Sequence, residues 1–385
     1  MSDNAQSFTQ SGPHGIGYDF NCGCRVFCPQ GAAWRVVLKD EDTGNILFEH
    51  AFEGGVVQSA RRSFVRFHLD IWRDGAHVFT HQFNLKGQAV RIDMRLGALG
   101  DQLAWMGQVE RFQAVNGCAL TCIMTPPVAA LLAPVYPEMQ ILCPDDADEG
   151  CYYATYKVCI FYNDDRGLHQ PVDYRLAGLY GNAAHILGLE PQEHKPRLPL
   201  VDEQRPIKEP YVCIAVQASG LAKYWNNPYG WQAVVTFLKE AGYRVICIDQ
   251  KPISGKDLSW IPMPHGCEDQ TGDRPLQERV WWIQHAAFFV GLSSGLSWLA
   301  WAAHCPVVMI SGFTQPFNEF QTEWRVINRN VCNGCANDVR CRFDAHDFFW
   351  CPRHKGEQQA FECTKLILPE QVIKTIQKLQ HSLQV

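Results

Sequence analysis

Three features that would quickly assign a sequence to a class of protein are missing from this chain of 385 residues. No apolar run approaches the roughly 18 residues that a membrane-spanning helix needs. The first residues lack the charged and then apolar pattern of a secretory signal peptide. Lys and Arg number 34 against 40 Asp and Glu, so no surplus of positive charge is present to bind nucleic acid. We therefore expect a cytoplasmic protein with no membrane span and no nucleic-acid partner.

Cysteine, by contrast, is abundant, with 17 residues in a chain of otherwise ordinary globular composition. Without an export signal these thiols are expected to be reduced, and clusters of them indicate metal binding. Single cysteines in apolar stretches are interpreted as small buried hydrophobic residues. One cluster lies near the start: Cys22, Cys24 and Cys28. His14 could complete its ligand set, so the spacing leaves a metal site open there. The other cluster lies near the end: Cys332, Cys335, Cys341, Cys351 and Cys363.

The hydrophobic pattern divides the chain into regions. Residues 1–20 are polar, and we expect them to be flexible. Residues 21–90 contain short alternating segments separated by turn sequences such as Thr43-Gly44-Asn45 and Asp74-Gly75, which is typical of a small antiparallel β-domain. From residue 91 onward strand-like and helix-like segments alternate, as they do in a parallel sheet covered by helices.

A Pro-rich polar stretch over residues 191–210 interrupts this alternation and is typical of a linker. The alternation then resumes up to about residue 330. The fold class is therefore predicted to be α/β, with two Rossmann-like domains at residues 91–200 and 201–330 and a ligand cleft between them. Residues 331–364 hold the second cysteine cluster, and residues 365–385 are expected to form a C-terminal helix.

Two loops that follow predicted strands carry candidate functional residues. In GALGDQLAW (97–105), Asp101 stands at the start of a helix, where it either caps that helix or acts as a general base in the cleft. In VQASGLAKYW (216–225), Ser219 opens the loop and Lys223 follows it. A lone lysine is usually solvated, but at the mouth of a cleft its charge could neutralise a diphosphate leaving group.

A third loop, within FFVGLSSGLSWLAWAA (288–303), runs from a strand directly into a helix. The hydroxyl groups of Ser293 and Ser294 and the N–H groups at the helix start would form an anion site suited to phosphate. Gly295 leaves room beside them. An ordinary strand-to-helix turn is the simpler interpretation, and no Gly-Lys-Ser/Thr follows as in a Walker loop.

Together and in this order, the three loops resemble those of the ADP-heptose glycosyltransferases of the GT-B fold. The resemblance implies a catalytic base at Asp101 and phosphate-binding residues at Ser219 and Lys223. It also implies a donor-binding signature over residues 290–300, which includes Ser293, Ser294, Gly295 and Leu296. The sequence departs from that signature at Ser293, where the family has an acidic residue, and at Trp298, where it has a histidine.

The second cysteine cluster, near the end of the chain, points to one family among these glycosyltransferases. Cys332 and Cys335 form a C-x₂-C pair, and two later thiols would complete four soft ligands for zinc or iron. Spacing alone leaves Cys341 as a fifth candidate. A β-domain, a GT-B core and such a finger together resemble the bacterial autotransporter heptosyltransferases. That family has an iron finger of pattern C-x₂-C-x₁₅-C-x₁₁-C and assembles into large homo-oligomers. The resemblance implies one structural iron per chain, with zinc as the alternative, on these ligands: Cys332, Cys335, Cys351 and Cys363.

The implied function is inverting transfer of heptose from ADP-heptose to serine hydroxyls of an autotransporter passenger. Asp101 would take the proton from the acceptor serine, and Lys223 would stabilise the departing diphosphate. Two alternatives stay open. One is a lipopolysaccharide-type glycosyltransferase that acts on a small glycan. The other is a non-enzymatic, iron-binding partner of an autotransporter, which the departures at Ser293 and Trp298 keep in consideration.

Overall fold

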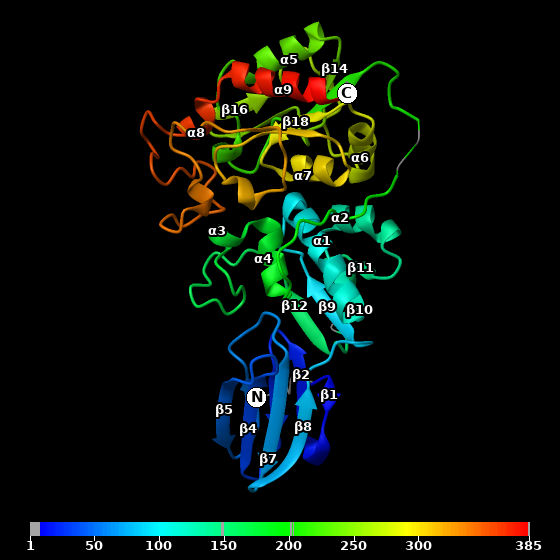
Figure 1. Cartoon of the computed structure of the whole chain (residues 1–385), viewed down its shortest axis with the longest axis vertical. Coiled ribbons are helices and arrows are strands. Elements are labelled where there is room, and N and C mark those ends of the chain that lie inside the picture. The colour runs from blue at the N-terminus through cyan, green and yellow to red at the C-terminus, as the bar shows by residue number, and fades with distance from the viewer. Residues whose placement is uncertain (1–7, 148–149, 201, 203, 384–385) are drawn as a thin grey trace.

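The computed structural model describes residues 8–147, 150–200, 202 and 204–383. Figure 1 shows three regions stacked along the long axis, with an N-terminal β region below, one α/β half in the middle and a second α/β half above it. All seventeen cysteines are free thiols. Within the described ranges, no helix is both long enough and apolar enough to cross a bilayer.

An antiparallel sheet of order β5-β4-β7-β8 forms one side of the N-terminal region. Its strands are β4 (Trp34–Asp40), β5 (Ile46–Phe52), β7 (Phe67–Arg73) and β8 (Ala76–Gln82). Asp74 and Gly75 join β7 to β8 with φ values of 51° and 82°. Positive φ at both positions is what a type I′ turn requires, so the hairpin predicted from Asp74-Gly75 is confirmed.

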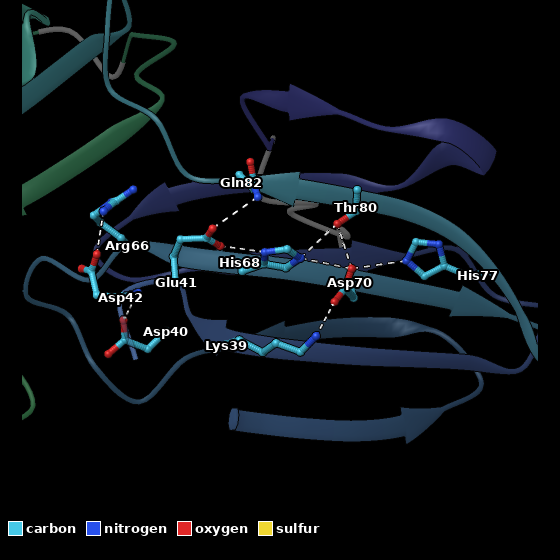
Figure 2. Close-up of polar contacts among 10 residues, drawn as sticks. All are labelled: Lys39, Asp40, Glu41, Asp42, Arg66, His68, Asp70, His77, Thr80 and Gln82. Atoms are coloured by element: carbon cyan, nitrogen blue, oxygen red, sulfur yellow. Dashed lines mark hydrogen bonds and ion pairs between the residues drawn. The ribbon is translucent and has the colours of Figure 1, made fainter. Parts of the chain in front are cut away.

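Asp70, on the outer face of this sheet, is a hub of polar contacts (Figure 2). Its carboxylate accepts hydrogen bonds from Lys39 at 2.8 Å and Thr80 at 2.8 Å, and it lies 3.3 Å from ring nitrogens of both His68 and His77. Burial by itself would raise the pKa of Asp70. The hydrogen bonds from Lys39, Thr80 and His77 outweigh burial and hold the pKa well below its usual range. The β region is thus stabilised by polar contacts as well as by its core.

The middle half contains a mixed sheet of order β11-β10-β9-β12-β2-β3-β6. The strands β11, β10, β9, β12 and β2 run parallel, whereas β3 and β6 are antiparallel additions and β1 pairs with β2. The bounds are β1 (Gln10–Ser11), β2 (Gly17–Asn21), β3 (Arg25–Cys28), β6 (Gly55–Gln58), β9 (Ala89–Asp93), β10 (Ala119–Ile123), β11 (Gln140–Leu142) and β12 (Ala154–Lys157).

Region boundaries were predicted from the sequence at residues 20 and 90. The strands of this sheet come from both sides of each boundary. Strand β2 starts within the stretch expected to be flexible, and its residue Phe20 is buried and donates its N–H to Tyr153 at 2.9 Å. The β region and the middle half therefore share one sheet and one core. Residues 1–7 lie outside the described residues.

Helices cover the middle sheet and lead toward the upper half. They are α1 (Leu99–Asn116), α2 (Pro126–Leu132), α3 (Tyr174–Ala177) and α4 (Leu179–Ile186). Gly178, with φ of 70°, separates α3 from α4. The linker that follows is docked rather than loose, since Glu193 accepts hydrogen bonds from Trp301 Nε1 and the Gln321 N–H of the upper half.

The upper half is a parallel sheet of order β17-β14-β13-β18-β19-β20, with the hairpin β15–β16 inserted beside it. Its strands are β13 (Tyr211–Ile214), β14 (Arg244–Cys247), β15 (Ile253–Lys256), β16 (Ser259–Pro262), β17 (Glu268–Asp269), β18 (Phe289–Leu292), β19 (Val307–Ile310) and β20 (Arg325–Val326). Its helices are α5 (Gly230–Glu240), α6 (Leu276–Gln284), α7 (Gly295–Ala302), α8 (Glu362–Lys365) and α9 (Pro369–Leu383). Val372, Ile376 and Leu379 of α9 are buried in its core. Counted along the chain, the strand order is 3-2-1-4-5-6, that of a Rossmann fold.

Candidate functional site

The two α/β halves have one switch point each, where the strand order reverses and ligands bind in such sheets. In the middle half it lies between β9 and β12, and the loop after β9 leads into α1 and Asp101. In the upper half it lies between β13 and β18, and the loops after these strands carry Ser219 with Lys223 and Ser293 with Ser294. The topology alone therefore places the three sequence motifs at the two switch points.

The two helix starts at these switch points meet directly, and Figure 1 shows the beginning of α1 beside α7. A side chain added at Gly100 would lie 2.7 Å from Trp298 Cδ1 and 3.3 Å from the Gly295 Cα. One added at Gly295 would lie 3.0 Å from the Cβ of Leu99. Glycine at both positions thus allows the two helices to touch. The ring of Trp298 occupies the space beside Gly100, and the ring of Trp105 occupies the space beside Gly97.

Asp101 occupies the first turn of α1, and its role as a general base stays a prediction. Its Oδ2 accepts a hydrogen bond from the Ala98 N–H at 2.9 Å, so it caps the helix. It also lines a cavity of about 740 Å³. Burial raises the pKa of Asp101, while the charge of Lys223 and the Ala98 hydrogen bond oppose the rise. A raised pKa suits a general base better than the ordinary value of a carboxylate.

Lys223, whose charge acts on Asp101, lies in the short turn Leu221–Lys223 of the upper half. Its Nζ lies 5.6 Å from the centre of the Phe313 ring. The loop that carries it is anchored by a buried carboxylate that sequence reasoning missed. Asp249 accepts hydrogen bonds from the N–H groups of Val216 at 2.7 Å and Gln217 at 3.2 Å. An aspartate directly after the buried segment YRVICI was the available signal. Ser219 itself is exposed at the bend.

Ser293 and the start of α7 rest on a buried polar network that was also missed. Thr314 Oγ1 lies 3.4 Å from the Ser293 Oγ and 3.0 Å from the Ser311 Oγ, and it donates to Glu319. Glu319 is fully buried and is paired with Arg325. The first N–H groups of a helix have no intrahelical acceptor, so those of Gly295 and Leu296 remain suited to an anion. The donor-binding assignments of Ser219, Lys223 and residues 293–296 stay predictions.

The cavity on which Asp101 opens is walled by two different parts of the chain. One wall belongs to the middle half and is largely apolar, with Leu96, Trp105, Ile160 and Tyr162. The other wall consists of residues 342–346, which belong to the cysteine-rich finger. Ser219, Lys223 and Ser293 do not line it. Of the predicted catalytic and donor-binding residues, Asp101 thus lines this cavity.

The finger contains the four cysteines that the family resemblance selects as ligands. Cys332 Sγ and Cys335 Sγ are 4.0 Å apart, close to the about 3.8 Å edge of a tetrahedron with metal–sulfur bonds of about 2.3 Å. Burial, with added repulsion from Cys332 and Cys363, raises the pKa of Cys335 to about 12. Burial likewise raises the pKa of Cys363 to about 12, with added repulsion from Cys351 and Cys332. Cys332 and Cys335 are thus placed to share a soft cation, which would hold them as thiolates. The set of four cysteines stays a prediction.

Two further side chains stand near this cluster. Donor atoms of Cys332, His354 and Glu362 lie within 4.8 Å of one another. Glu362 Oε1 accepts the N–H of Cys332 at 3.0 Å, and His354 Nδ1 lies 2.9 Å from Glu357. The donor atoms of these three residues are close enough together to hold a metal ion. His354 and Glu362 were not selected from the sequence, because only the spacing of the cysteines was considered in this segment.

The remaining clustered cysteines have other surroundings. Cys24 and Cys28 are fully buried in the hydrophobic core of the β region. His14 lies 3.3 Å from Arg73 Nη1. Within the described residues, the metal-compatible grouping that includes a cysteine lies at the finger and not here. Cys341 packs against the small hydrophobic cluster of the finger and donates its N–H to Asp338 at 2.9 Å.

Comparison with known proteins first defines a class. Residues 177–343 match the model of glycosyltransferase family 9 (heptosyltransferase), and residues 12–75 match the N-terminal domain of the glycosyltransferase TibC. The lipopolysaccharide heptosyltransferase II of Escherichia coli has the same fold, with a TM-score of 0.52 at 14% identity over 77% of this chain and 100% of that chain. The chain is a GT-B glycosyltransferase by fold.

Closer relatives define the family. The crystal structure of the dodecameric, iron-containing heptosyltransferase TibC, in complex with ADP-D-β-D-heptose, matches with a TM-score of 0.95 and 47% identity over 98% of this chain and 99% of that chain. The autotransporter heptosyltransferase TibC of Escherichia coli is 48% identical over 97% of this chain and 92% of its own length. The inactive autotransporter heptosyltransferase BimC of Burkholderia thailandensis is 42% identical over 98% and 89%. The chain belongs to the autotransporter heptosyltransferase family.

Proposed function

We propose that this protein transfers heptose from ADP-heptose to serine hydroxyls of an autotransporter passenger, with inversion at the anomeric carbon. The observation that carries the proposal is the meeting of the two switch points, with Asp101 on one side and the loops of Ser219, Lys223 and Ser294 on the other. The relatives named for autotransporters and the TibC complex with ADP-heptose support the substrate classes.

The donor diphosphate is bound by the upper half in this proposal. The N–H groups at the start of α7 and the Lys223 ammonium face the position of the diphosphate and stabilise its charge as ADP leaves. Ser219 and Ser293 add hydroxyl donors. The buried network from Thr314 to Arg325 keeps the Ser293 loop in place, and Asp249 keeps the Lys223 loop in place. Preorganised donors of this kind cost no reorganisation during the reaction.

Asp101 takes the proton from the acceptor serine in the cavity, and the serine oxygen attacks the anomeric carbon. The Ala98 N–H fixes the orientation of the carboxylate through Oδ2. Lys223 has a second effect, since its charge keeps the raised pKa of Asp101 from rising further. The same lysine therefore helps the base stay ionised and helps the leaving group depart.

The finger binds one iron through Cys332, Cys335, Cys351 and Cys363, with zinc as the alternative ion. An ion held by four thiolates has no open position and supplies a structural cross-link. The 4.0 Å distance between the sulfur atoms of Cys332 and Cys335 supports this set, and the iron-containing TibC supports the choice of metal. By analogy with dodecameric TibC, the chain assembles into a large homo-oligomer. Its seventeen free thiols fit the reducing cytoplasm.

Replacement of Asp101 by asparagine tests the proposal. Asp101→Asn keeps an oxygen for the Ala98 hydrogen bond but removes the base, so we expect transfer to fall by at least roughly 100-fold with an unchanged melting temperature. Mass spectrometry of a co-expressed passenger would measure transfer as heptose increments on serine. Wild-type transfer by the asparagine variant would contradict the assignment of the base.

The inactive relative makes the non-enzymatic partner a second candidate. The departures at Ser293 and Trp298 are the features that favour it. A wild-type protein that binds iron and passenger but transfers no heptose from ADP-heptose would establish that alternative. Transfer to a lipid-linked sugar but not to the passenger would favour the lipopolysaccharide-type enzyme.

A further inference from the structure

The finger contributes more to the molecule than a metal site, because it contacts both halves across the cleft. Toward the upper half, the Phe348 carbonyl accepts the N–H of Leu221 at 2.8 Å, and the Gly312 carbonyl accepts the N–H of Gly334 at 2.8 Å. Toward the middle half, Arg175 Nη1 donates to the Val339 carbonyl at 2.8 Å. Figure 1 shows the finger (orange) beside α3 on one flank of both halves.

Five consecutive finger residues, 342–346, face the cavity that contains Asp101. Three of them, Arg342, Asp344 and His346, carry polar or charged side chains that are exposed. None of the five is a cysteine or a core residue of either α/β half. Their position on the wall of the Asp101 cavity is therefore not explained by metal binding.

We propose that residues 342–346, the acceptor segment, form a specificity-determining wall that binds the polypeptide on either side of the acceptor serine. This inference rests on the proposed function and deepens it. A serine side chain fills only a small part of a 740 Å³ cavity, so the residues that flank the serine must enter as well. An extended backbone presents donors and acceptors that need polar partners, which Arg342, Asp344 and His346 offer.

The opposite wall complements this polar segment. Leu96, Ile160 and Tyr162 provide apolar and aromatic surface, and Leu96 is largely exposed. A polypeptide in the cavity would place small or apolar side chains on this wall and its backbone along the acceptor segment. The two walls thus suit an extended polypeptide rather than a donor diphosphate, whose proposed ligands Ser219, Lys223 and Ser293 do not line the cavity.

The acceptor segment is held in position at several points. Arg342 Nε donates to Asn163 Oδ1 at 3.1 Å, which joins the finger to the loop after β12. The Phe343 ring lies 5.4 Å from that of Tyr162 and 5.0 Å from that of Trp350. Cys335 and Cys351 flank the segment in sequence, so a metal bound by both would fix the ends of the loop that contains it. The metal would then act on acceptor binding through the position of this loop.

Steady-state kinetics with a serine-containing passenger segment test the inference. We expect Arg342→Ala to raise the KM for the passenger roughly tenfold, the effect of about one lost charge-assisted hydrogen bond. The KM for ADP-heptose, donor hydrolysis without acceptor, and metal content should stay within about twofold, because Lys223 and the thiols are untouched. Arg342→Lys should recover part of the loss, and Asp344→Ala should act in the same direction as Arg342→Ala.

Arg340→Ala is the matched control. Arg340 lies in the same finger with a side chain that is 81% exposed, pairs with Asp338, and does not line the cavity. The inference would be overturned if Arg342→Ala or Asp344→Ala had the same KM for the passenger as Arg340→Ala. Parallel losses of passenger transfer, donor hydrolysis and metal would do the same, since they would show a structural role only.

Direct binding of a fluorescent passenger segment to the same variants gives a readout that needs no turnover. Weaker binding by Arg342→Ala than by Arg340→Ala supports the acceptor segment even if the wild-type protein transfers no heptose. Equal binding by the two variants contradicts the inference. Failure of transfer by the wild-type protein is a separate result, which would contradict the proposed function.

Discussion

The two cysteine-rich regions of this protein use the same residue in opposite ways. In the N-terminal region, Cys24 and Cys28 are buried among the aromatic and aliphatic side chains of a sheet that other contacts already stabilise. In the finger, the described secondary structure is limited to short turns and α8, and its hydrophobic cluster is small. In a region with a complete hydrophobic core, a thiol acts as a small apolar side chain. In a segment that lacks such a core, thiols that bind a metal stabilise the fold in its place.

The largest expected effect is the loss of a finger thiol. Cys332→Ser replaces a soft thiolate with a hydroxyl, so we expect loss of the metal, local unfolding of residues 331–363 and loss of transfer to the passenger. Metal analysis and limited proteolysis would follow the first two effects. The N-terminal region should keep its protection from proteolysis. Unchanged metal content would contradict the ligand set.

A smaller effect is expected where the N-terminal region depends on polar contacts. Asp70→Asn should lower the free energy of unfolding by about 2 kcal/mol, because it removes a charge that holds Lys39, Thr80 and His77. Asp42→Asn is the control, since Asp42 and Arg66 are both about half exposed and such pairs contribute little. Urea unfolding of both variants would measure the difference, and equal stabilities would contradict the hub role of Asp70.

The pH dependence of that stability follows from the direction of the Asp70 shift. The pKa of Asp70 is lower in the folded protein than in the unfolded chain, where an aspartate has its ordinary pKa of about 4. Its stabilisation is therefore complete above that ordinary value and is lost as the pH falls from there toward the folded pKa. The difference between wild type and Asp70→Asn should shrink as urea unfolding is repeated from pH 6 down to about pH 3. A difference that stays constant over this range would exclude a charged Asp70 as its source.

Cys24→Ala should have a lesser effect. It removes one buried sulfur atom from the core, with an expected cost of about 1 kcal/mol and no change in metal content or transfer. The backbone bond from Cys24 N–H to Ser59 Oγ does not depend on the side chain. Loss of metal in this variant would show that the two regions do not differ as described.

The smallest effect is expected for Cys341→Ser, the matched control for Cys332→Ser within the same finger. Cys341 is only partly buried. Its backbone N–H and carbonyl groups form hydrogen bonds with Asp338 and Arg175. Stability should change by less than about 0.5 kcal/mol, with full metal content. Loss of metal would make Cys341 a ligand and would revise the cysteine spacing.

Local pattern in the amino-acid sequence was sufficient to predict the α/β halves, the hairpin at Asp74-Gly75 and a metal-binding cluster of late cysteines. Hydrophobic period, turn residues and ligand spacing are properties of short segments, so they can be recognised without a structure. The loops of Asp101, Lys223 and Ser293 were recognised for the same reason, as Gly- and Ser-rich turns between strands and helices. Helix α9 and the strand alternation on both sides of the linker also follow from local pattern.

What those loops contact is a property of the folded chain alone. The pairing of β2 with β12, the hydrogen bonds of the buried Asp249 to Val216 and Gln217, and the contact between Gly100 and Trp298 join residues far apart in sequence. The same holds for the acceptor segment, which lies more than 200 residues from Asp101 in the chain and beside the same cavity in space. Local pattern carries no information about such contacts, because the packing of whole elements against one another creates them.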